Sequence, residues 1–263
     1  MVTQLTQLPA SAADDMRARL LEKKGHLQQV YDVLVKLNTP ELTQAERLTL
    51  EHEKTLLLIP TVASALKLKQ ADLEHLNSRK SPPDTEVLAG ENNEAAIMAE
   101  KVTLLAQLCH LEQRLIANPD DASLTQQVAD VAGQLAVKEL ALKQQQVAVL
   151  RRKISMAHHP ETLQELLAGE EHEVAILQQL DKVTCEIQAI NLQILDPGVH
   201  TVSYLSLFTS LVQTQVKSVE LQLEMKRENI HQLDLRLKPE DQQASFRMEW
   251  NNLPVAGSAG RGG

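Results

Sequence analysis

Apolar residues recur along most of this chain every three or four positions, which is the spacing of one face of an α-helix. One run alternates strictly between steps of four and three: Ile176, Leu180, Val183, Ile187, Ile190 and Ile194. A second run continues this alternation around a single lysine: Val212, Val216, Val219, Leu223, Lys226, Ile230 and Leu233. Sustained spacing of 3.5 residues is typical of coiled coils. The pattern therefore predicts an all-α fold of long helices, and no segment has the alternation of a strand.

Prolines divide this helical pattern at nearly regular intervals. The main breaks are Pro40, Pro82-Pro83, Pro119, Pro160, Pro197 and Pro239. Proline fits the first turn of a helix but not its interior, so each break is predicted to end one helix and open the next. The clearest predicted start is Asn118-Pro119-Asp120-Asp121. Two pairs have the spacing of a capping box: Thr43 with Glu46, and Thr162 with Glu165.

Grouping the segments in pairs predicts an elongated bundle of three antiparallel helical hairpins. The predicted domains are an N-terminal tail over 1–13, hairpins over 14–80, 81–158 and 159–238, and a disordered tail over 239–263. Pro60 lies inside the first hairpin and predicts a bend there. In the C-terminal tail, Phe246 and Trp250 form an apolar cluster that either docks on a partner or folds back on the last hairpin.

A sequence echo supports the hairpin as the repeating unit. Leu88–Glu91 recurs as Leu167–Glu170, 79 positions later, and Glu94 to Ile97 matches Glu173 to Ile176. This period equals two proline intervals, as a duplicated hairpin requires, although coincidence in a biased sequence gives the same pattern. Gly90 and Gly169 within the echo are interpreted as marking the entry from a loop into a helix.

Composition excludes several classes of function. Only 2% of residues are aromatic, whereas ligand pockets are usually lined by aromatic side chains. The net charge of −9 opposes non-specific binding to nucleic acid or anionic lipid, and we interpret the basic run Arg151–Lys153 as a solvated helix end. The two cysteines form no disulfide framework, and no segment has the pattern of a signal peptide or a membrane span. We therefore expect a cytoplasmic protein without a membrane partner.

No set of residues has the pattern of a catalytic, cofactor or metal site. His158 and His159 are adjacent and point apart, so they do not form a metal site. Cys109 and Cys185 fall beside core positions and are interpreted as small buried thiols. The carboxylates are interpreted as lying on solvated helix faces. The sequence therefore predicts a protein that is not an enzyme and has no cofactor, metal or small-molecule substrate.

The long, aromatic-poor helices over about 14–237 resemble, in general style, the coiled-coil subunits of microtubule- and centrosome-linked complexes, augmin among them. The resemblance implies a structural subunit that binds other coiled-coil proteins in a hetero-oligomer of the mitotic spindle or microtubule cytoskeleton. We expect the last hairpin, about 160–237, to be the main partner-binding element, because it carries the strictest heptads. Lys226 within it either sets partner choice or lies at the rim of an intramolecular hairpin.

An adaptor for a small GTPase is the alternative function. Antiparallel hairpins of this length resemble the helical fingers by which Rho-effector kinases hold small GTPases. The segment Leu21–Gly25 is similar to the Lys-x-Gly segment of those fingers. The apolar and acidic residues that normally follow that segment are not reproduced here.

Overall fold

The computed structural model describes residues 10–39, 41–78, 83–157, 160–194 and 201–237. Within these residues the chain forms six α-helices: α1 (Ala10–Leu37), α2 (Gln44–Asn77), α3 (Thr85–Ala117), α4 (Ala122–Met156), α5 (Glu161–Ile194) and α6 (Thr201–Arg236). None of the described residues belongs to a strand. The prediction of an all-α fold is confirmed.

Each junction between consecutive helices contains one of the predicted proline breaks. The details of the helix starts differ from the prediction. α4 begins at Ala122 and its N-cap is Asp121, whose carboxylate accepts a hydrogen bond from the Leu124 amide at 3.0 Å. The predicted start at Asn118 is wrong, because Asn118 is the C-cap of α3 and a turn separates the two caps.

One of the two predicted capping boxes is present. Thr43 Oγ1 accepts from the Glu46 amide, and the Glu46 carboxylate accepts from the Thr43 amide at 2.8 Å. Thr162 is not a cap, because α5 begins at Glu161 and the Pro160 carbonyl already accepts from the Gln164 amide. α2 runs without a break through Pro60, so the helix does not end and resume there.

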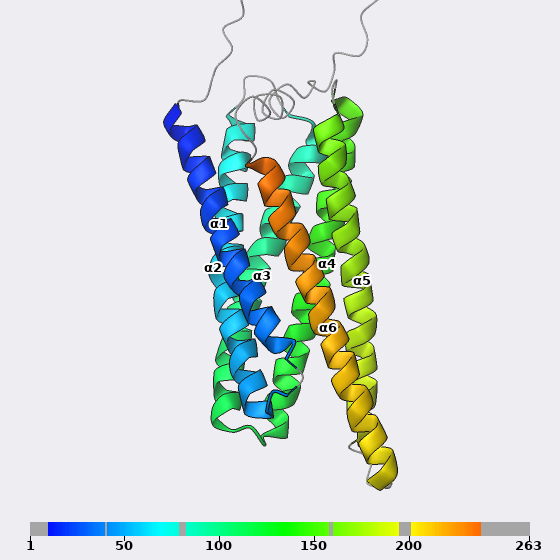
Figure 1. The fold of residues 1–263 in the computed structure, drawn as a ribbon. Coiled ribbons are helices and arrows are strands. Elements are labelled where there is room, and N and C mark those ends of the chain that lie inside the picture. The colour runs from blue at the N-terminus through cyan, green and yellow to red at the C-terminus, as the bar shows by residue number, and fades with distance from the viewer. Residues whose placement is uncertain (1–9, 40, 79–82, 158–159, 195–200, 238–263) are drawn as a thin grey trace, which may run out of the picture.

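The six helices form a closed ring (Figure 1). Each helix packs against the helices before and after it in the chain, and α1 packs against α6. Consecutive helices run in opposite directions. At the lower end of the ring in Figure 1, α6 continues beyond the first four helices. This extension leaves one end of α6 without a neighbour from the first four helices.

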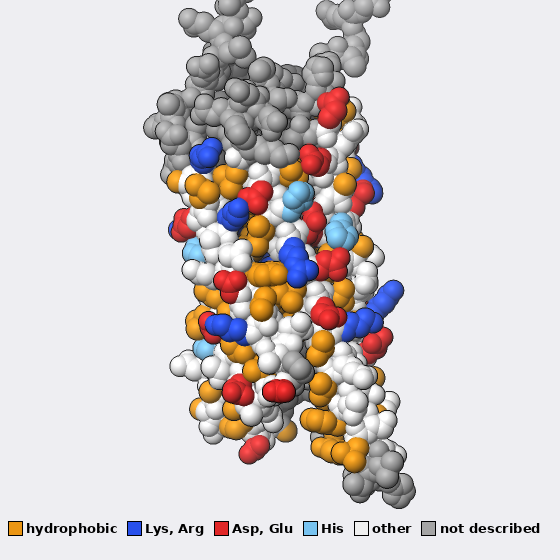
Figure 2. All heavy atoms as spheres, in the orientation of Figure 1, with side chains coloured by type: hydrophobic (Ala, Val, Ile, Leu, Met, Phe, Trp, Pro, Cys, Tyr) orange, Lys and Arg blue, Asp and Glu red, His pale blue; other side chains and the backbone are white. Residues whose placement is uncertain are grey.

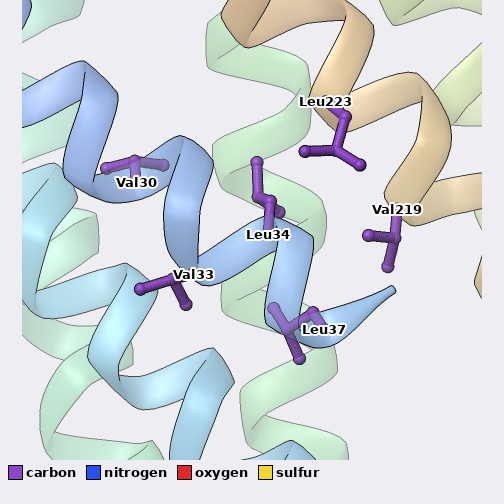
Figure 3. Close-up of a cluster of buried hydrophobic side chains, with 6 residues drawn as sticks. All are labelled: Val30, Val33, Leu34, Leu37, Val219 and Leu223. Carbon is purple, nitrogen blue, oxygen red and sulfur yellow. The ribbon is translucent and has the colours of Figure 1, made fainter. Parts of the chain in front are cut away.

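The contact between α1 and α6 is built from aliphatic side chains (Figure 3). Leu34 and Leu37 of α1 point towards Val219 and Leu223 of α6, and Val30 and Val33 belong to the same buried cluster. Val30 and Leu34 are completely buried. Burying a side chain of this size contributes about 1.5–3 kcal/mol to stability. The C-terminal part of α1 is therefore packed tightly into the ring, and α1 ends at Leu37 beside α6.

α4 carries two apolar stripes, one with Leu135 and Leu142 and the other with Leu140, and they pack on different neighbours. Leu142 packs in a cluster with Ile97 and Met98 of α3. Leu140, on the other stripe, packs against a cluster of α5 and α6 residues that includes Ile176. Leu135 is half-buried against a third cluster, between α3 and α4.

Leu142→Asp should lower the free energy of unfolding by several kcal/mol, because it places an unpaired charge at a position that is 5% exposed. Thermal or urea denaturation measures the loss. Val137→Asp is the matched control, because Val137 lies on the same helix and is 66% exposed. Equal stability of the two variants would show that Leu142 is not a core position.

Candidate functional site

Charged side chains lie buried between the helices of the ring. Five glutamates, Glu91, Glu94, Glu112, Glu170 and Glu173, are each less than a tenth exposed. The interpretation of the carboxylates as lying on solvated helix faces is wrong for these residues. Burying a carboxylate without a partner costs several kcal/mol, so the arrangement around each group decides whether the fold can hold it.

The first buried ion-pair site joins α2, α3 and α4. Lys69 of α2 pairs with both Glu91 and Glu94 of α3, and its Nζ lies 2.7 Å from Glu94 Oε2. Lys153 of α4 also pairs with Glu91. Lys153 is only 2% exposed, so the interpretation of the basic run as a solvated helix end is wrong for this residue.

The second buried ion-pair site repeats the first with α4, α5 and α6. Lys143 of α4 lies 2.8 Å from Glu170 and 2.5 Å from Glu173 of α5. Gln232 of α6 donates to Glu173 Oε1 at 3.1 Å, whereas Lys153 in the first site pairs with Glu91, the counterpart of Glu170. Gln232 and Lys153 are also 79 positions apart. The sequence echo therefore corresponds to equivalent positions in the bundle.

The two glutamates of each site have pKa values that are shifted in opposite directions. Burial raises a carboxyl pKa, but Lys153 and Lys69 more than offset it and lower the pKa of Glu91. Glu94 has a raised pKa because burial outweighs the attraction of Lys69. In the second site the pKa of Glu170 is lowered and that of Glu173 is raised in the same way. Each lysine therefore lies between one ionised carboxylate and a second carboxyl that holds a proton more readily.

Glycines permit the close helix contacts beside both sites. A Cβ atom at Gly90 would lie 2.4 Å from Val149 Cγ2, and one at Gly169 would lie 2.3 Å from Gln232 Nε2. The interpretation of these glycines as loop-to-helix entries is wrong, because both lie inside helices. Their function is to let α4 and α6 approach.

A further buried titratable cluster, around Glu112, has no catalytic geometry. Burial raises the pKa of Glu112 to about 7, and Thr55 Oγ1 donates to its Oε1 at 3.0 Å. His52 Nδ1 lies 3.5 Å from Glu112 Oε2 and 4.0 Å from Cys109 Sγ. A nucleophile–histidine–carboxylate relay uses both ring nitrogens, whereas here both partners approach Nδ1. Burial also raises the pKa of Cys109, so its thiol stays protonated.

Further chemistry is not apparent in the described part of the chain. No three histidine, cysteine, aspartate or glutamate side chains among the described residues are grouped to hold a metal ion. None of the six helices has an apolar stretch that meets the requirement for a membrane span. An open depression of about 270 Å³ lies between α1 and α6, but Arg227 and Tyr31 in its wall already bond to each other at 3.1 Å. Cys185 is exposed, so its interpretation as a buried thiol is wrong.

An apolar surface lies at the lower end of α6, beyond the point at which α1 ends. We define the distal arm as residues 187–194 of α5 and 201–216 of α6. On α6, Tyr204, Leu205 and Phe208 are 43%, 63% and 50% exposed, and the two rings are stacked with centroids 6.5 Å apart. Figure 2 shows apolar side chains gathered at this lower end of α6.

The residues predicted to bind partners fall into three groups. Five are buried within the bundle: Ile176, Val183, Val219, Leu223 and Leu233. Eight are half-buried: Leu180, Ile187, Ile190, Ile194, Val212, Val216, Lys226 and Ile230. Phe246 and Trp250 lie outside the described residues. The amine of Lys226 is desolvated among α4 and α6 side chains, which lowers its pKa, although Glu139 partly offsets this.

Sequence reasoning did not single out the exposed residues of the distal arm. Tyr204, Leu205 and Phe208 precede the heptad run that begins at Val212. A signal was present, because 187–194 and 201–216 contain no charged residue in a chain of which 23% is charged. Absence of charge over this length distinguishes the segment from the other helices.

Comparison of the chain with protein-family models, with curated proteins and with solved structures gives no match.

Gly90→Ala should lower the free energy of unfolding by about 1–3 kcal/mol, because the new methyl group overlaps the stiff side chain of Val149. Gly25→Ala is the control, since no atom lies within 4 Å of its added Cβ, and it should raise stability by about 0.5–1 kcal/mol. Urea denaturation of both variants measures the difference. Equal effects at the two glycines would exclude the close contact.

Lys23 predicts a pH dependence of stability. Burial, Arg236 and Lys143 lower its pKa to about 7, and Glu170 and Glu173 only partly offset them. The unfolded chain, with a lysine pKa of about 10.4, binds the proton more tightly, so the contribution of Lys23 to stability rises with pH above about 7. This contribution rises by at most about 1.4 kcal/mol per pH unit.

Urea denaturation at pH 7, 8 and 9 measures this slope. For Lys23→Met, the free energy of unfolding should rise less steeply with pH than for the wild type, by the contribution of Lys23. Lys24→Met retains the Lys23 amine and should keep the wild-type slope. Identical slopes for Lys23→Met and the wild type would contradict the assignment.

Proposed function

We propose that this chain is a non-enzymatic structural subunit that joins a multi-protein assembly through its distal arm. The observation that carries the proposal is the uncovered apolar surface of Tyr204, Leu205 and Phe208 at the end of α6. Other exposed large apolar residues are distributed over four different helices: Leu21, Val35, Leu56, Ile116 and Val137. Scattered residues of that kind are normal, whereas a contiguous group indicates an interaction site.

The composition of the distal arm resembles the core of a protein interface. Interface cores are depleted of charged residues and enriched in tyrosine and phenylalanine. The arm has no charged residue and carries one of the two tyrosines and one of the two phenylalanines of the chain. Exposed aromatic side chains of this kind supply much of the binding energy when a partner buries them.

The occupant that suits this surface is a helix. Tyr204 and Phe208 are four positions apart, and Leu205 and Phe208 are three apart, so all three lie along one face of α6. A partner helix packing along that face would extend the bundle in the manner of a coiled coil. The half-buried Val212 and Val216 continue the same face towards the ring.

The resemblance to coiled-coil subunits of microtubule- and centrosome-linked complexes supplies the cellular setting of the proposal. In that setting the chain is a subunit of a hetero-oligomer in the mitotic spindle or microtubule cytoskeleton, and its partners are other coiled-coil proteins. Its aliphatic core and its arm, which ends clear of the ring, suit such a subunit.

Replacing Leu205 and Phe208 with aspartate should remove the partner subunits that co-purify from native cells with the tagged chain. Both side chains are exposed, so the double variant should remain folded, and circular dichroism checks this. Val137→Asp changes an equally exposed apolar residue on α4 and should retain the partners. Nucleotide-dependent recovery of a small GTPase, in place of stoichiometric helical subunits, would refute the assembly proposal and favour the adaptor.

A further inference from the structure

We infer that the N-terminal part of α1, residues 10–25, is a hinged segment that packs against α6 while the Lys23 amine is neutral and moves away from α6 when that amine is protonated. Gly25 is the hinge. The hinged segment lies at the upper end of the ring in Figure 1, whereas the distal arm lies at the lower end. The inference is therefore independent of the proposed function.

Burial divides α1 into two parts. No residue from Arg17 to His26 is buried, and Leu21 is 50% exposed. From Leu27 onwards, five side chains are buried: Leu27, Val30, Val33, Leu34 and Leu37. Local opening has the lowest free energy where few apolar side chains are buried. The C-terminal part of α1 is therefore held in the ring by apolar packing that residues 17–25 do not have.

Gly25 lies at the boundary between these two parts. Gly90 is required by a close helix contact, but no atom lies within 4 Å of a Cβ added at Gly25. Glycine inside a helix is less favourable than alanine because its backbone is freer, so a helix bends more easily there. The next residue, His26, has its Nδ1 buried without a hydrogen-bond partner among the described residues. Bending at Gly25 would return that nitrogen to water.

An exposed ion pair joins the hinged segment to α6. Lys24 pairs with Asp234, and the two side chains are 35% and 49% exposed. An ion pair that is this open to water adds little to stability. Moving the segment away from α6 therefore loses little at this contact.

The Lys23 amine opposes the packed position when it is charged. The charged groups around it come from four helices: Arg236 of α6, Lys143 of α4, Glu170 and Glu173 of α5, and Asp72 of α2, which interacts with Arg236. The two glutamates already pair with Lys143. Burial and the neighbouring positive charges lower the pKa of Lys23 to about 7. A proton on this amine therefore favours the position in which water reaches it.

The pH range of the movement follows from the two positions. When the segment has moved away, Lys23 is hydrated and has the ordinary lysine pKa of about 10.4. The open position therefore binds the proton more tightly than the packed one, in which the pKa is about 7. Opening is most favourable at and below about pH 7. Its equilibrium constant falls by up to about tenfold per pH unit as the pH rises from there towards 10.

Hydrogen exchange of the full-length chain at pH 7, 8 and 9 tests the inference. Protection factors correct for the intrinsic effect of pH on exchange. Those of residues 14–25 should be lower than those of residues 28–37 and should rise at least tenfold from pH 7 to pH 9. In Lys23→Met this rise should disappear. His26→Gln removes the neighbouring titratable group, retains Lys23 and should keep the rise.

A rise that persists in Lys23→Met would overturn the inference. Equal protection of the two parts of α1 at every pH would also overturn it, because α1 would then open only with the whole bundle.

Gly25→Ala tests the hinge itself. The variant should raise the protection factors of residues 14–24 at pH 7 about two- to fivefold, because alanine makes the helix harder to bend. Gly133→Ala is the matched control. Gly133 also lies inside a helix with no atom within 4 Å of an added Cβ, but buried residues lie on both sides of it, Val131 and Leu142. This control should leave the hinged segment at its wild-type protection.

The alternative to a hinge is gradual fraying from the N-terminal end of α1. Fraying gives protection that increases steadily along the helix without a step at Gly25, and it leaves the exchange of residues 14–24 unchanged in Gly25→Ala. Either result would overturn the inference.

Discussion

The ring depends on the pairing of lysines buried between its helices with glutamates from a neighbouring helix. Lys69 between Glu91 and Glu94, and Lys143 between Glu170 and Glu173, have to lose their hydration when the helices pack. Removing one partner of such a group costs about 3–5 kcal/mol, although replacing the whole group with apolar residues is often neutral. The ion pairs therefore contribute less to net stability than to selecting a helix order and register, because a slipped register leaves a buried charge without a partner.

The apolar clusters supply the stability that the buried ion pairs do not. They lie between neighbouring helices around the ring, as between α1 and α6 or between α5 and α6, and supply the free energy that offsets the cost of burying charge. Gly90 and Gly169 connect the two, since each lies directly before the first glutamate of a site and permits the next helix to approach. The close helix contact at glycine and the two buried glutamates thus recur 79 positions apart, whereas the lysines that pair with them, Lys69 and Lys143, are 74 positions apart.

Much of the helical framework could be predicted from the sequence, because proline breaks and the period of apolar residues are local signals. Which helix or side chain packs against each helix face could not be predicted from the sequence. Lys153 was interpreted as solvated because a basic residue near a helix end usually is, and its burial depends on Glu91, which is 62 positions earlier. Gly169 was interpreted as a loop entry because glycine is unfavourable inside a helix. The contact that explains it, with Gln232, comes from another helix and is not visible in the local sequence. The predicted partner-binding residues Ile176 and Leu223 are buried because heptad spacing identifies an apolar face but does not say whether the cover is the chain itself.

The same distinction explains why the candidate interaction surface lies at the distal arm. An apolar stripe on α6 is covered wherever α1 runs beside it, so its upper part has no free energy to gain from a partner. Below Leu37 the stripe continues but its cover does not, and Phe208 remains half exposed. Because α1 ends at Leu37, in the cluster that includes Val219, and α6 begins 18 positions before Val219, one continuous stripe has a structural part and a part open to a partner. Since the charged residues lie outside the arm, binding there leaves the ion pairs of the ring intact, and association does not require the bundle to open.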